Sequence, residues 1–229
     1  MNSLQNTGRS ARLTGNIEQT YSGQSLQAAL NVLTDEFTIQ TGDDAGTYAD
    51  FVPFTTDGYL DLENSRIRIG GLITAALNNT VKLQKVIGPP QKFDATTTAS
   101  STAVVTSRTG LLVGQSVTGV GIPAGATIVA VTATGFTMSA GATATGSTLI
   151  TLTGTADITA AATVAATAAT AATAAQAVPF VPLNGGPPVT FRKGDKLRLV
   201  LVAVTSLGVG RSLITHLPYV ARLAPGLNP

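Results

Sequence analysis

The chain has 229 residues, of which 14 are Lys or Arg and 12 are Asp or Glu, giving a net charge of +2. Charged residues make up 11% of the chain, against about 25% in ordinary globular proteins, whereas hydrophobic residues make up 44%. This composition argues against disorder of the whole chain, and a small, scattered basic excess argues against a nucleic-acid binder. The absence of cysteine excludes disulfides and thiolate metal sites.

The N-terminal residues 1–20 are polar and include Arg9 and Arg12. They predict an extended arm, which is either a loosely held terminus or a partner-binding segment. The start of the chain lacks the apolar stretch of a signal peptide. No apolar window is long enough for a bilayer, so we expect no membrane partner.

The segment 22–33 has apolar residues spaced i, i+3, i+4, i+7, namely Leu26, Ala29, Leu30 and Leu33. This spacing predicts a short helix with Ser22 or Ser25 as its N-cap. A strand is the alternative, because Val32 and the following residues 37–41 favour extended structure.

From Phe37 to Val86 the apolar period changes to two, which predicts about five short strands. Asp57-Gly58 is typical of a tight hairpin turn. After the loop 184–188, the segment Lys196–Val204 is the strongest predicted strand, with Leu and Arg alternating in its first half. A last strand is expected at 212–215, followed by an extended tail from Pro218. The two ends together predict a mainly β, jelly-roll-like antiparallel sandwich.

Between these ends lies a region almost without charge. Residues 95–191 contain only two charged residues, Arg108 and Asp157. We therefore predict a discontinuous base domain, 21–93 plus 178–229, that carries an inserted β-module at 94–155. The connecting segment 156–177 is nearly pure Ala and Thr. It predicts either a low-complexity linker or a helix with a Thr face.

The insert contains short apolar runs separated by Gly and Pro turns, and we expect a core that includes Phe136 and Met138. Its pattern G-x-x-V-x-G-x-G-I-P-x-G-x-x-I, from Gly114 to Ile128, continues at 136–143. This pattern resembles a small β-module that is common in tailed-phage structural proteins. The flanking β-domain, by pattern and size, resembles the jelly-roll cement (decoration) proteins of phage heads. These resemblances imply a virion protein on the capsid surface, with the major capsid protein and two further copies of itself as partners.

The residues with catalytic or ligand potential favour structural interpretations. His216 is the only histidine, and no nucleophile elbow accompanies it. Asp43 and Asp44 lack the spacing of a calcium loop and indicate a turn. The acid pairs Asp35/Glu36 and Asp61/Glu63 could serve a glycoside hydrolase, but outward-facing acids are expected on any sheet. We predict no catalytic residue, no cofactor and no metal site.

The basic residues give the only candidate contact site, for which we select Arg9, Arg12, Arg192, Lys193, Lys196 and Arg198. We expect them to face an acidic capsid surface in a cement protein that stabilises the assembled head, as a trimer. A tail, fibre or baseplate component with an adhesive insert is the first alternative, and a carbohydrate-binding module or hydrolase is the second. The insert is also the expected contact for a host-surface glycan.

Overall fold

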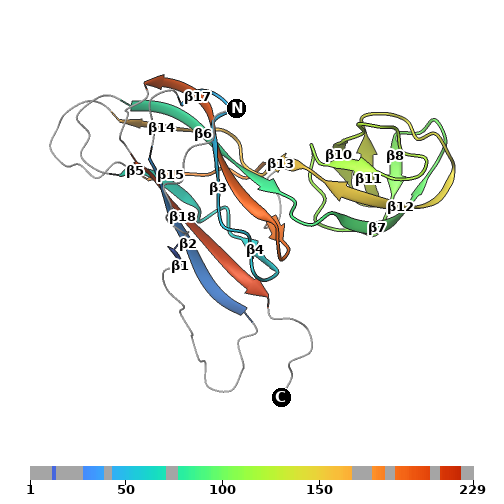
Figure 1. Ribbon diagram of the computed structural model, residues 1–229, viewed down its shortest axis with the longest axis horizontal. Helices are drawn as coiled ribbons and strands as arrows, with labels where there is room; N and C mark the ends of the chain where they lie inside the picture. Colours follow the sequence, from blue (N-terminus) through green and yellow to red (C-terminus); the bar gives the residue numbers. More distant parts are fainter. Residues whose placement is uncertain are drawn as a thin grey trace, which may run out of the picture. The chain divides into compact units, whose positions relative to one another are not determined.

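The computed structural model describes residues 12–13, 28–38, 43–70, 77–166, 177–183, 189–206 and 212–222. These residues form antiparallel strands and contain no α-helix, which confirms the predicted mainly β, sandwich-like fold. The chain divides into two compact units, shown in Figure 1. We call Met1–Gln84 with Ile158–Pro229 the base, and Lys85–Asp157 the barrel. The predicted insert, 94–155, lies within the range of the barrel.

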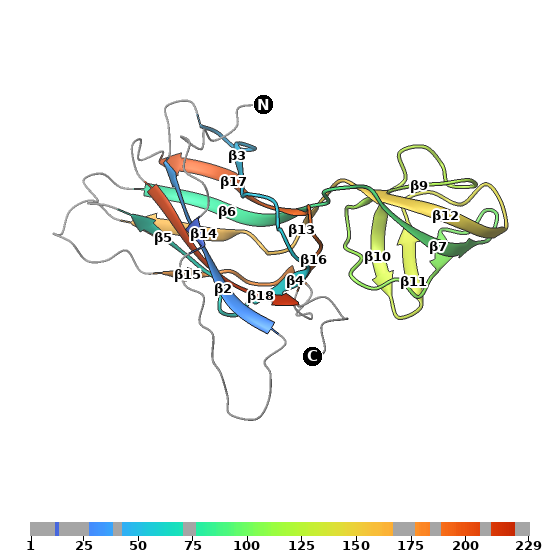
Figure 2. The ribbon, with the colours of Figure 1, turned by 60° about the horizontal axis from the view of Figure 1, so that its bottom comes forward.

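The first sheet of the base is built around its last strand (Figure 2). β18 (Ser212–Arg222) pairs along its whole length with β2 (Ala28–Thr38). On its other side it pairs with β5 (Arg66–Gly70) and β4 (Gly58–Leu60). The sheet is completed by β1 (Arg12–Leu13) beside β2, β15 (Val178–Pro179) beside β5, and β16 (Val189–Phe191) beside β4.

The second sheet of the base has β17 (Lys196–Ser206) between β6 (Leu77–Val86) and β3 (Tyr48–Asp50). β14 (Ala162–Ala166) also pairs with β6. The predicted alternation of β17 is observed, since Leu197, Leu199 and Leu201 are fully buried. The rings of Phe191 and Tyr219, from the first sheet, each lie within 4.6 Å of the Phe54 ring, centroid to centroid, and anchor the core of the base.

Pro218 lies in the middle of β18, where proline would normally interrupt a ladder. It is paired with Val32 on one side. On the other side, β5 pairs as far as His216 and β4 pairs from Tyr219 onward. The Pro218 carbonyl accepts a hydrogen bond from the Asp61 N–H at 2.9 Å, just beyond β4. The N–H that Pro218 lacks therefore falls between the part of β18 that pairs with β5 and the part that pairs with β4. The prediction that this strand ends at Thr215 was wrong, because β18 continues to Arg222.

The helix predicted for 22–33 is wrong for residues 28–33, which belong to β2; residues 22–27 lie outside the described residues. The helical spacing is a local signal, whereas β2 forms eleven register pairs with β18. Pairing along a whole strand outweighs the small differences in intrinsic propensity between these residues.

The helix alternative for 156–177 is wrong over Ala162–Ala166, which is strand β14; residues 167–176 lie outside the described residues. Ala162 and Val164 are buried, and the Thr163 hydroxyl lies 3.4 Å from that of Thr80 on β6. Ala and Thr fit a strand here because small side chains alternate between core and surface, which the composition alone did not indicate.

Asp57-Gly58 does not form a hairpin, because the strands on either side of it belong to different sheets. β3 pairs with β17, whereas β4 pairs with β18 and β16. Gly58 has a packing reason instead: a Cβ at this position would lie 2.4 Å from the ring of Tyr219.

The barrel contains a six-stranded sheet in the order β10-β11-β8-β7-β12-β9. Its strands are β7 (Gln91–Thr97), β8 (Ala103–Val105), β9 (Ser116–Thr118), β10 (Ile128–Thr132), β11 (Gly135–Met138) and β12 (Gly146–Thr153). The next strand, β13 (Thr155–Asp157), pairs with β6 and does not belong to this sheet. Backbone hydrogen bonds from Ile128 to Gln115 and from Val117 to Ala126 join the two ends of the sheet. Phe136 and Met138 lie in its buried core, as predicted.

Candidate interaction surface

The predicted contact residues do not form one site. Arg9 lies outside the described residues, and Arg12 is in β1. Arg192 and Lys193 are exposed in the turn between β16 and β17, and Lys196 is half-buried at the start of β17. Arg198 follows two positions later, on the same face of the strand as Lys196.

Four hydrogen bonds fix the turn that carries Arg192 and Lys193. The buried Asp195 carboxylate accepts a hydrogen bond from the Arg192 N–H at 2.9 Å. The Lys193 N–H donates to Asp57 Oδ1 at 2.8 Å. The Gly194 N–H donates to the Phe54 carbonyl, and the Phe54 N–H donates to the Asp195 carbonyl. Two exposed cations are thus displayed on a fixed backbone, which lowers the entropy that a contact would cost.

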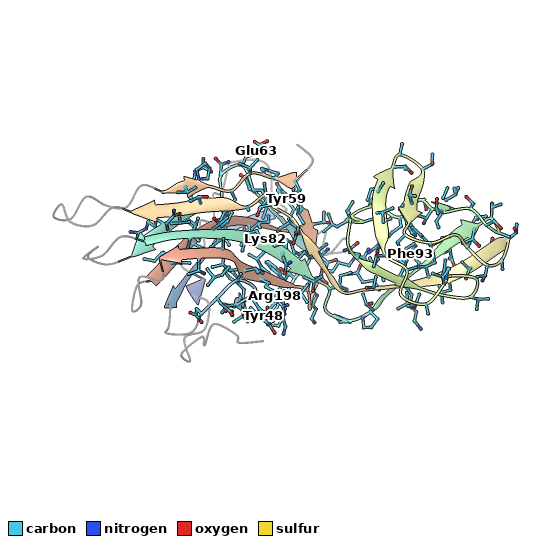
Figure 3. The ribbon with its side chains drawn as sticks, turned by 90° about the horizontal axis from the view of Figure 1, so that it is seen from above. Tyr48, Tyr59, Glu63, Lys82, Phe93 and Arg198 are labelled. Carbon is cyan, nitrogen blue, oxygen red and sulfur yellow. The ribbon has the colours of Figure 1, made fainter. Side chains whose placement is uncertain are left out.

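Arg198 does not offer a free charge to a partner. Its Nε and Nη2 atoms donate to the two carboxylate oxygens of Asp50 at 2.5 and 3.1 Å. Its guanidinium lies 3.8 Å from the centre of the Tyr48 ring (Figure 3). The hydrogen bond to Asp50 raises the pKa of Arg198 above its ordinary value. We therefore assign Arg198 a structural role between β17 and β3. No local sequence signal indicates this pair, because 148 positions separate the two residues.

Two of the acidic residues considered as ligands or catalytic pairs, Asp44 and Asp61, stabilise turns, whereas Asp35 and Glu36 lie in strand β2. Asp44 and Thr47 are joined by hydrogen bonds between the Asp44 N–H and Thr47 Oγ1 and between that hydroxyl and Asp44 Oδ1. The Asp61 carboxylate accepts hydrogen bonds from the backbone and side chain of Asn64. Asp61 and Glu63 were expected on one strand face, but β4 ends at Leu60 and both lie in the following turn.

The loop that carries the phage-like pattern is fixed by its backbone. The Ile122 N–H donates to the Gly119 carbonyl, and the Thr143 N–H donates to the Gly121 carbonyl at 2.9 Å. Gly121 has φ +77°, a conformation that favours glycine. Ile122 packs against the barrel core, so these pattern residues have a clear role in folding.

The barrel surface combines little charge with several exposed aliphatic side chains. Only five of its residues are charged, namely Lys85, Lys92, Asp94, Arg108 and Asp157. The largest exposed fractions belong to Val120 at 83%, Val105 at 57% and Leu149 at 52%. Surfaces of this composition are typical of protein contacts more than of sugar clefts, which use aromatic platforms.

Within the described ranges, the structure contains no group of three or more His, Asp or Glu residues that is placed to hold a metal ion. No helix in that part of the chain is long and apolar enough to cross a membrane. Comparison with protein-family models, with curated proteins and with solved structures gave no match for this chain.

Proposed function

We propose that this chain is a virion structural protein, a cement protein that binds and stabilises an assembled phage head. The observation that carries the proposal is the rigid, exposed Arg192-Lys193 turn on the base, which is well suited to an acidic surface. The barrel, with its charge-poor and partly aliphatic surface, is then the element that projects from the shell or contacts a neighbouring copy.

The proposed mechanism is thermodynamic linkage. A protein that binds the assembled shell, and not its free subunits, stabilises the shell by mass action. A homotrimer, arranged with closed cyclic symmetry, would contact several shell subunits at once, and its avidity would exceed that of a single contact.

The test is co-sedimentation of the purified chain with empty heads of the encoding phage and with unassembled capsid subunits, followed by cryo-EM of the particles. We expect binding to heads alone, at many copies per head. The double variant Arg192→Gln/Lys193→Gln should bind heads more weakly, whereas Lys92→Gln on the barrel should bind as the wild type does. Density at the tail in a few copies would support the tail or fibre alternative, and absence from particles would overturn both.

A further inference from the structure

A second basic surface lies on the outer face of the first sheet of the base, and it was not predicted. β5 places Arg66 directly opposite His216 of β18, and Arg68 directly opposite Ile214. The alternate residues Ile67, Leu213 and Thr215 are fully buried. Because opposite residues of an antiparallel pair share a face, Arg66, Arg68 and His216 lie together on the outer face.

The same row continues to the arm at the start of the chain. His216 is paired with Thr34 of β2, and Thr34 with Arg12 of β1. The register therefore aligns Arg12, Thr34, His216 and Arg66 across four neighbouring strands. Three basic positions from distant parts of the sequence meet in one row, and Arg68 stands two residues from it on the same face.

This surface is only partly compensated within the described residues. Arg66 donates through Nη1 to the backbone carbonyls of Glu63 and Ser65, which fix its guanidinium without neutralising it. Arg68 and His216 are exposed, and in this part of the chain their side chains form no ion pair. Two acidic positions lie close by in sequence or register: Glu63, in the turn before β5, and Glu36, which the register places opposite Ile214.

From this arrangement we propose that the outer face of β5 and β18 binds carboxylate groups on an acidic segment of a partner protein. The guanidinium fork matches a carboxylate in a bidentate geometry. Nucleic acid fits less well, because its binding is dominated by contacts of many Lys and Arg residues with phosphates, and this row offers few such cations. The identification of the partner as a shell subunit rests on the proposed function, whereas the preference for carboxylates rests on the basic residues of this surface alone.

The test uses the full chain and a polyglutamate peptide at low salt, with duplex DNA of similar charge as the competing probe. Binding is measured by isothermal titration calorimetry. For the double variant Arg68→Gln/His216→Gln we expect the affinity for polyglutamate to fall about tenfold, the effect of removing one charge contact and one hydrogen-bond donor worth about 0.7 kcal/mol each. Lys92→Gln, which removes an exposed cation of the barrel, should leave that affinity unchanged.

Circular dichroism spectra and thermal midpoints establish that each variant is folded, and Arg66→Lys tests whether the bidentate fork is needed. Unchanged polyglutamate binding by the double variant would overturn the proposal, as would tighter binding of DNA through the same residues. Polyglutamate binding without binding to heads would sink the proposed function alone. Head binding that is insensitive to the double variant would overturn only the identification of a shell subunit as the partner of this surface.

Discussion

At the level of single residues, Arg198 and Asp50 join the outer faces of β17 and β3. The pair is bidentate, and the guanidinium also lies against Tyr48. Exposed ion pairs contribute roughly 0.2–1 kcal/mol, and the double contact places this partly buried pair near the upper end. Asp50→Asn should therefore lower the free energy of unfolding by about 1 kcal/mol in urea titrations. Asp94→Asn in the barrel is the control, and an equal loss there would contradict the assignment.

Tyr219 gives the base a dependence on alkaline pH. Burial raises the pKa of Tyr219 to about 12, and its hydroxyl donates to the Thr56 carbonyl at 2.8 Å. The ordinary tyrosine pKa is about 10. The raised value contributes stability that is fully present below pH ~10 and is lost as pH rises towards about 12.

The corresponding measurement compares thermal midpoints of the wild type and Tyr219→Phe from pH 8 to 12. At pH 8 the variant should be less stable by about 1 kcal/mol, the value of one hydrogen bond. Above pH ~10 the difference between the two proteins should shrink, because the variant has no proton to lose at this position. A constant difference over the whole pH range would show that Tyr219 does not titrate as assigned.

At the level of elements, the hairpin of β10 and β11 depends on Gly135. Gly135 and Gly146 have similar backbone angles, φ +157° and +146°. A Cβ on Gly135 would lie 1.9 Å from the Val104 carbonyl oxygen, whereas nothing lies within 4 Å of a Cβ on Gly146. The two sites thus share the conformational cost of alanine and differ only in the clash.

We expect Gly135→Ala to destabilise the barrel by about 2 kcal/mol more than Gly146→Ala, the usual cost of forcing extra atoms into a packed site. Hydrogen exchange of the barrel amides, resolved from those of the base, measures the difference. Equal protection in the two variants would mean that the Val104 strand moves aside without cost.

Strands with a period of two were the predictable part of this fold. In residues 66–68 and 196–199, burial alternates with sequence, so the local pattern carries the information. The pattern did not locate β2, because the helical spacing of Leu26 to Leu33 is a local feature, whereas its pairing with β18 is not. The hairpin prediction for Asp57-Gly58 failed for a similar reason, because no local signal tells which sheet each flanking strand joins.

The candidate surfaces were predictable to a smaller extent. Arg192 and Lys193 are adjacent in sequence and precede Gly194, so an exposed basic turn followed directly from the pattern. The row of Arg12, His216 and Arg66 depends on the order of strands in a sheet, which composition and periodicity do not contain. The ion pair of Arg198 with Asp50 also joins residues that are distant in sequence, and only the register between β3 and β17 reveals it.

At the level of the whole molecule, hydrogen bonds within each unit join the two chain segments at which that unit begins and ends. In the base, the Ile158 N–H donates to the Leu83 carbonyl at 3.0 Å. In the barrel, the Ile87 N–H donates to the Gly154 carbonyl at 2.9 Å, and Gln91 is paired with Leu152. Each unit therefore holds its own ends together.

Replacement of Lys85–Asp157 by a loop of about four Gly and Ser residues should leave the base folded, because hairpin loops of this length span paired strands. The isolated barrel should fold as well. Calorimetry should show one cooperative transition for each fragment, near the corresponding transition of the full chain. Loss of cooperative unfolding in the shortened base would show that the units are not independent.

The central place of β18 also sets the order in which the molecule can be completed during synthesis. All strands of the barrel have been synthesised once residue 157 is added, whereas β2, β4 and β5 must wait for residues 212–222, with which they pair. Strands that wait with open edges are prone to aggregate. We therefore expect a chain interrupted before Ser212 to carry a folded barrel on an incomplete base, so that only chains that include β18 present the basic row to a partner.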